Sequence, residues 1–226
     1  MPQSEPTPSR VDRFLTNVFR RPAAVRGNLV LAIDATASRQ PTWDTAAHLQ
    51  SGMFREVASI GLLDVQAVFF RGSLHAYAEC KASNWLSDPA KLAAFMTGVT
   101  CRAGQTQIVR VLDHVLRESN QRKIGALVYV GDCCEEPRDH LVPLARRLAD
   151  QNIPIFIFQE GLDPQAEMIF REIAQVTKGA FQRFDQGSAR QLGELLRAVA
   201  VFATGGVTAL EHHGSNAARL LLGQIR

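Results

Sequence analysis

Short, almost uninterrupted apolar stretches, separated by segments with helical periodicity, constrain the fold of this chain most. The clearest of them are IGALVYV at residues 124–130 and IPIFIF at residues 153–158. A strand that is apolar on both sides is buried on both faces, which is typical of a parallel sheet covered by helices. The intervening segments carry apolar residues every three or four positions, as amphipathic helices do. The sequence therefore predicts an α/β protein.

The apolar pattern predicts six strands in a doubly wound, Rossmann-like sheet with helices on both faces. The predicted strands are residues 29–33, 63–70, 75–80, 124–130, 153–158 and 181–184. The predicted helices are residues 42–58, 88–96, 107–118, 139–150, 164–176 and 188–200, and residues 216–225 have a further helical pattern. The sheet should be mostly parallel. Only the strand at 75–80, joined to its predecessor through Arg71-Gly72-Ser73, is expected to run antiparallel at an edge.

Positive charge is concentrated at the amino terminus. The chain has 25 Lys and Arg against 22 Asp and Glu, and residues 1–26 alone hold five arginines and two acidic residues. The rest is neutral overall, which argues against a nucleic-acid-binding surface on the main domain, because phosphate binding requires clustered cations. We therefore predict a basic arm at residues 1–26 with a short amphipathic helix at 11–21, a main domain at 27–203 and a carboxyl-terminal extension at 204–226.

The spacing of the cysteines and the shortness of the apolar runs indicate in which cellular compartment the protein resides. Cys80, Cys101, Cys133 and Cys134 form no CxxC pair and no His/Cys metal pattern. There is no apolar signal-peptide stretch and no run near the ~20 apolar residues that span a bilayer. We expect a reduced, cytoplasmic protein without a transmembrane segment. The vicinal pair Cys133-Cys134 is interpreted as apolar filling, with a redox switch as the alternative; the sequence does not indicate the oligomeric state.

Carboxylate and hydroxyl residues follow the predicted strands at the positions where ligands bind in such sheets. Asp34, Thr36 and Ser38 come directly after the first strand, Thr106 precedes a helix, and Asp132 follows the fourth strand. In open parallel sheets, ligands bind beyond the carboxyl ends of the strands, where the strand order reverses. An all-oxygen donor set with only two carboxylates suits Mg²⁺ or Mn²⁺ better than Zn²⁺.

These residues, in this order, resemble the metal-ion-dependent adhesion site of the von Willebrand factor A (VWA) domain family, bacterial single-domain type, over about residues 27–200. The family has Asp-x-Ser-x-Ser after the first strand, a Thr in a Gly-x-Thr loop, and an Asp after the fourth strand. Here Asp34, Thr36 and Ser38 match the first element, Thr106 the second and Asp132 the third. The resemblance implies that the three hydroxyls bind the cation directly and that the two carboxylates act mostly through bound water.

Two features depart from the family's pattern. Thr36 stands where Ser is usual and keeps the hydroxyl. Arg39-Gln40-Pro41 follows where many members have Met or Gly, so the loop can differ in geometry. Arg39 would also place a cation beside the metal, which either lowers the affinity for it or neutralises an acidic ligand.

A cation held by few carboxylates keeps an open coordination position, which an Asp or Glu of a partner protein can fill. We therefore expect a protein-binding module that depends on Mg²⁺ or Mn²⁺, and not an enzyme. Two alternatives remain: a metal-free scaffold of the same fold, and a metal-dependent hydrolase or phosphoesterase with Glu135 or Glu136 as general base. Those two acids are more simply interpreted as favourable charge at the start of the next helix. No phosphate-binding GxxxxGK[ST] and no GxSxG motif is present.

Overall fold

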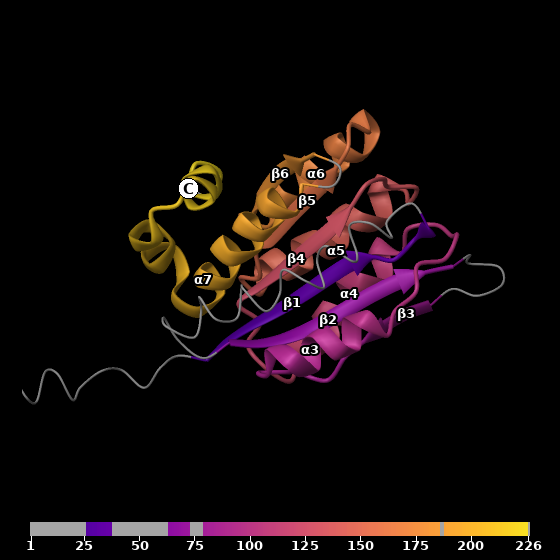
Figure 1. Cartoon of the computed structure of the whole chain (residues 1–226). Coiled ribbons are helices and arrows are strands. Elements are labelled where there is room, and N and C mark those ends of the chain that lie inside the picture. Colours follow the sequence, from indigo (N-terminus) through magenta and orange to yellow (C-terminus); the bar gives the residue numbers. More distant parts are fainter. Residues whose placement is uncertain (1–25, 38–62, 73–78, 186–187, 226) are drawn as a thin grey trace, which may run out of the picture.

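The computed structural model describes residues 26–37, 63–72, 79–185 and 188–225. The helices predicted at 11–21 and 42–58 lie outside these ranges, as do Ser38 and Arg39. Figure 1 shows one twisted sheet between helices on its two faces. This arrangement confirms the predicted α/β, Rossmann-like architecture.

Six strands form the sheet in the order β3-β2-β1-β4-β5-β6 (Figure 1). All neighbouring strands are parallel except β2 and β3, which are antiparallel, as predicted for one edge. The strand order reverses at β1, because β2 pairs with one side of β1 and β4 with the other. The strands are β1 (Gly27–Asp34), β2 (Leu63–Arg71), β3 (Glu79–Ala82), β4 (Ala126–Gly131), β5 (Ile155–Glu160) and β6 (Ala180–Phe184).

Strand β3 overlaps the strand predicted at residues 75–80 at its last two positions and continues to Ala82, while residues 75–78 lie outside the described ranges. Arg71 pairs with Glu79 and Val68 with Ala82, so Arg71 still belongs to β2. The prediction of a tight turn through Arg71-Gly72-Ser73 was therefore wrong. The Arg71 Nε donates to the Glu79 carboxylate at 2.5 Å, and this cross-strand ion pair stabilises the observed register.

The helices form two layers, with α3, α7 and α8 on one face of the sheet and α4, α5 and α6 on the other (Figure 1). Asp88 caps the first turn of α3 and Asp163 that of α6, and a proline follows each aspartate. These signals fix where the two helices begin, and both helices begin within one residue of the predicted positions. The helices are α3 (Pro89–Thr97), α4 (Ile108–Ser119), α5 (Arg138–Asp150), α6 (Pro164–Val176), α7 (Ala189–His213) and α8 (Asn216–Leu222).

Helix α7 continues beyond residue 200, where its predicted end lies. It extends to His213, but Gly206 has non-helical dihedral angles (φ 66°, ψ −156°) and divides it into two segments. The helix thus crosses the domain boundary predicted at residue 204. Helix α8 then packs into the same core through four buried side chains, Ala217, Ala218, Leu221 and Leu222.

Two glycines allow the α7 backbone to approach the sheet closely. A Cβ atom on Gly27 would lie 2.7 Å from the Ala203 carbonyl oxygen, and one on Gly125 would lie 2.9 Å from the same atom. Gly27 begins β1, and Gly125 immediately precedes β4. Any larger residue at either position would push the helix away from the sheet.

Within the described ranges, one helical stretch, Arg190–His213 of α7, is long and apolar enough to cross a membrane, with a mean hydropathy of 1.3. Its side chains Leu192, Leu196 and Val199 are buried against the sheet. Because core helices meet the same criteria and Gly206 interrupts this one, we interpret α7 as part of the domain's core.

Candidate metal centre

Asp34 ends β1 at the point where the strand order reverses. Its side chain is fully buried, and its Oδ1 accepts a hydrogen bond from the Thr36 N–H at 2.7 Å. This is the Asx-type turn that an aspartate stabilises after a strand. The turn also buries the Thr36 side chain.

The carboxylates of Asp34 and Asp132 come together across neighbouring strands. Ile33 of β1 pairs with Val130 of β4, so the carboxyl ends of the two strands lie side by side. One carboxylate oxygen from each aspartate and the Cys133 Sγ all lie within 4.8 Å of one another. Two of the five predicted ligands therefore meet, together with a sulfur that sequence analysis did not include.

Thr106 lies in the loop before α4 and is 1% exposed. Its hydroxyl accepts a hydrogen bond from the Glu135 N–H at 3.1 Å, and its own N–H donates to the Glu135 carboxylate at 2.6 Å. The hydroxyl also bonds to the Glu136 carboxylate. A threonine oxygen has two lone pairs and one hydrogen, so one lone pair can still reach a cation. These contacts hold Thr106 against the loop that carries Asp132.

The Glu136 carboxylate caps α4 by accepting hydrogen bonds from the N–H groups of Ile108 and Val109, the latter at 3.0 Å. Burial raises the pKa of Glu136, while these bonds act in the opposite direction. The carboxylates of Glu135 and Glu136 thus bond to the start of α4 and to the loop before it. The interpretation from the sequence had instead placed their charge at the start of the next helix, α5. The first turn of a helix has N–H groups without helical partners, and this explains the preference.

Backbone contacts connect the remaining loops at this edge of the sheet. The Ala35 N–H donates to the Phe70 carbonyl at 3.0 Å, and the Ala35 carbonyl accepts from the Arg102 N–H at 3.0 Å. A Cβ atom on Gly104 would lie 2.4 Å from the backbone of Gly72, so the two glycines are in direct contact. The glycine of the Gly-x-Thr loop therefore has a steric role: it lets that loop pack on the end of β2.

Solved structures identify the fold. The von Willebrand factor type A structure from Catenulispora acidiphila aligns with a TM-score of 0.61 at 14% identity, covering 80% of this chain and 43% of that chain. This chain has the VWA fold. The hypothetical protein BatB from Bacteroides thetaiotaomicron aligns with a TM-score of 0.54 at 19% identity, covering 74% of this chain and 96% of that one. Manganese-loaded TRAP from Plasmodium vivax aligns with a TM-score of 0.53 at 17% identity, covering 75% and 72% of the two chains.

No protein-family description and no curated protein matches this sequence. The likeness to solved structures confirms the VWA fold predicted from the residues. The residues themselves must then indicate whether the metal site typical of VWA domains can form here.

The donor atoms at the VWA domain's carboxyl-terminal sheet edge suit a hard cation. Burial, followed by the negative charges of Asp132 and Glu135, raises the pKa of the Cys133 thiol, which also hydrogen-bonds to Asp132. The carboxylates of Asp34 and Asp132 and the hydroxyls of Thr36 and Thr106 are oxygen donors, the type that Mg²⁺ and Mn²⁺ prefer, whereas the Cys133 sulfur is a softer donor. The fifth predicted ligand, Ser38, lies outside the described residues.

Tyr129 lies beneath this centre and was not identified from the sequence. Its ring is buried and stacks on Phe70, with centroids 5.9 Å apart. A Cβ atom on Gly131 would lie 2.7 Å from the Tyr129 hydroxyl oxygen. Burial and the charge of Asp34 raise the pKa of Tyr129, and its hydroxyl has no hydrogen-bond partner among the described residues. The only signal in the sequence is a tyrosine inside an otherwise apolar strand.

Proposed function

We propose that this VWA domain is a protein-binding module that holds a divalent cation between the ends of β1 and β4 and offers it to an acidic side chain of a partner. The proposal depends on Asp34 and Asp132, whose carboxylate oxygens lie within 4.8 Å of each other, with Asp34 fully buried and Asp132 partly buried. Two negative charges this close repel each other strongly when poorly solvated. A divalent cation bound to both removes that cost.

The five predicted residues have distinct roles in this proposal. Asp34 and Asp132 supply the negative charge, while Thr36, Ser38 and Thr106 add oxygen donors without adding charge. When bound, the cation supplies a positive site that a carboxylate of a partner can enter. The manganese-loaded TRAP structure has the same fold and supports the use of Mn²⁺ as a probe.

A metal-dependent hydrolase is a weaker second candidate. Its general base would be Glu135 or Glu136, but the Glu135 carboxylate accepts a hydrogen bond from the loop before α4 and the Glu136 carboxylate accepts two from the start of α4. A general base must be within reach of the proton that it removes. Carboxylates already used to position a helix are poorly suited to that role.

Calorimetric titration of MnCl₂ and MgCl₂ into the full chain tests the cation site. We expect saturable binding to the wild type and an affinity at least about tenfold lower for Asp34→Asn. Asp150→Asn is the matched control, because it removes an exposed carboxylate at the far end of α5 and should bind like the wild type. If neither cation binds the wild type saturably, the metal-free scaffold is the correct interpretation.

Water-proton relaxation of the Mn²⁺-loaded protein tests the acidic partner. A carboxylate that enters the coordination shell displaces water, so N-acetyl-glutamate amide should lower the relaxation rate. N-acetyl-glutamine amide has the same size and no charge, and it should leave the rate unchanged. An equal response to both compounds would contradict recognition of an acidic side chain.

A further inference from the structure

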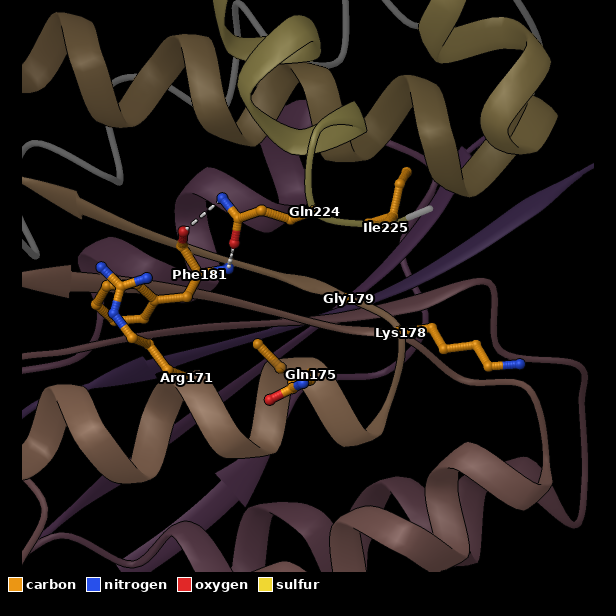
Figure 2. A pocket seen from close by; sticks show the side chains of 8 residues that line it. Arg171, Gln175, Lys178, Gly179, Phe181, Gln224 and Ile225 are labelled. Carbon is orange, nitrogen blue, oxygen red and sulfur yellow. Dashed lines mark hydrogen bonds between the residues drawn. The ribbon is translucent and has the colours of Figure 1, made fainter.

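The outer edge of β6 is covered by a glutamine side chain where another strand could pair. Gln224, which follows α8, accepts a hydrogen bond from the Phe181 N–H at 2.9 Å and donates one to the Phe181 carbonyl at 3.0 Å (Figure 2). Since β6 is an edge strand of the sheet, these two backbone groups point away from β5. The side-chain amide thus makes the two bonds that the peptide group of a neighbouring strand would make.

A second glutamine repeats this arrangement at the other end of β6. Gln191 of α7 donates to the Arg183 carbonyl at 3.2 Å and accepts from the Asp185 N–H at 3.2 Å. Exposed edge groups are a template for pairing with other extended chains. Here that template is protected by two side chains, so an incoming strand that displaces them replaces each lost hydrogen bond with a new one.

A pocket of about 680 Å³ opens beside this edge, between the end of α6 and the segment that follows α8. Figure 2 shows Gln224 on one side of Phe181 and Arg171 and Gln175 of α6 on the other. The volume is within the range of pockets that bind ligands. The protected backbone of β6 therefore lies next to space that another chain can occupy.

The charge of the pocket indicates which kind of chain fits it. Its lining contains two cations, Arg171 and Lys178, and no carboxylate. Arg171 pairs with Glu167 of α6, which is not part of the lining, at 2.7 Å, so Lys178 contributes most of the uncompensated positive charge. The Arg171 guanidinium lies 4.4 Å from the centroid of the Phe181 ring, which belongs to the residue whose backbone bonds to Gln224. A second copy of this domain pairing through β6 would bring the same cations face to face, whereas acidic side chains would be attracted.

We propose that the outer edge of β6 binds an extended, acidic segment of a partner protein by strand addition, with the backbone of that segment replacing the Gln224 amide and its acidic side chains facing Arg171 and Lys178. Strand addition obtains affinity from main-chain hydrogen bonds and specificity from alternate side chains. The site lies at the start of β6, away from the ends of β1 and β4, so binding here is independent of the cation.

Fluorescence anisotropy with the full chain tests this proposal, using the fluorescein-labelled peptide Thr-Glu-Val-Glu-Val-Glu-Thr as the probe. The wild type should bind it, and Gln224→Ala should bind it at least about fivefold more tightly, because the competing amide is gone. Gln121→Ala removes an exposed glutamine after α4 and should match the wild type. Circular dichroism establishes that each variant is folded, and Gln191→Ala provides a second variant of the same kind.

Three further measurements separate strand addition from other modes of binding. N-methylation of the central peptide nitrogens removes the main-chain donors and should weaken binding at least about tenfold, as should replacement of each Glu by Lys. Equal affinity of the original and N-methylated peptides, or no binding to either the wild type or Gln224→Ala, overturns the proposal. Loss of binding with EDTA would assign the peptide to the metal centre, and dimerisation of Gln224→Ala in light scattering would assign the β6 edge to a second copy.

Discussion

Thr106 and Glu135 hold each other through two hydrogen bonds, in each of which the backbone N–H of one residue bonds to the side chain of the other, at 2.6 and 3.1 Å. This pairing joins the loop before α4 to the loop after β4. The position of the Thr106 hydroxyl relative to Asp132 therefore depends on a residue that contributes no predicted ligand.

Replacing Thr106 tests this pairing. Thr106→Val keeps the shape of the side chain but leaves the Glu135 N–H without its acceptor. We expect it to lower the free energy of unfolding by about 1–3 kcal/mol, because it removes the hydrogen bonds of a buried hydroxyl, one of them to the Glu136 carboxylate. Thr106→Ser retains the hydroxyl and should lose less than about 1 kcal/mol. Urea denaturation without metal measures both, and equal losses in the two variants would contradict the role of the hydroxyl.

Replacing Gly104 tests the contact that positions the threonine loop. A Cβ atom there would lie 2.4 Å from the Gly72 backbone, whereas at Gly98 the nearest atom would be 3.4 Å away. Gly104→Ala should therefore cost about 1–3 kcal/mol through overpacking. Gly98→Ala, in ordinary helical geometry, should change stability by no more than about 0.5 kcal/mol. Thermal unfolding compares the two, and similar melting temperatures would show that the loop moves aside without cost.

Glu79 should make stability depend on pH in the acidic range. Its hydrogen bonds to Arg71 and Lys81 lower the pKa of Glu79 from 4.5 to about 2. Because the folded-state pKa is lower than the unfolded one, the stabilisation is complete above pH 4.5 and is lost as the pH falls towards 2. Glu79→Gln should flatten that part of the curve and cost at most about 1 kcal/mol at pH 7, since the pair is partly exposed. Urea unfolding between pH 7 and 2.5 measures this, and an unchanged slope would contradict it.

Tyr129 should tolerate the loss of its hydroxyl. That group is buried without a hydrogen-bond partner among the described residues, so Tyr129→Phe removes a desolvated polar atom. We expect stability without metal to be unchanged or to rise by up to about 1 kcal/mol. Tyr129→Leu also removes the ring stacked on Phe70 and should lose at least about 1 kcal/mol. A clear loss of stability in Tyr129→Phe would contradict this and mean that the hydroxyl has a bound partner. Chemical denaturation with and without Mn²⁺ would then show whether that partner depends on the cation.

The strands in the centre of the sheet could be predicted because burial on both faces leaves a continuous apolar run, as in β4 and β5. An antiparallel edge strand was predicted where β3 lies, but its register could not be, because its residues Glu79 and Lys81 are polar and its position depends on the ion pair with Arg71 on a neighbouring strand. The break in α7 had a signal in the adjacent glycines Gly205 and Gly206, but a pair of glycines alone does not show whether a helix bends or ends.

The meeting of Asp34 and Asp132 was predictable because both lie at the carboxyl ends of strands in a parallel sheet. The contacts of Thr106 with Glu135 were not, since tertiary packing alone brings these two loops together. The same is true of Cys133: the sequence places it beside Asp132, but only the fold shows that its sulfur faces the carboxylate of Asp34 as well.

The two glycines under Ala203 provide a way to recognise relatives of this chain whose sequences have diverged beyond ordinary comparison. Gly27 at the start of β1 and Gly125 just before the neighbouring strand β4 both lie close to one carbonyl oxygen of α7. A chain that seats its last long helix in this way must have a glycine at the start of its first strand and another just before its fourth. That paired signature, combined with the aspartates that follow the same two strands, can be searched for directly in genomes.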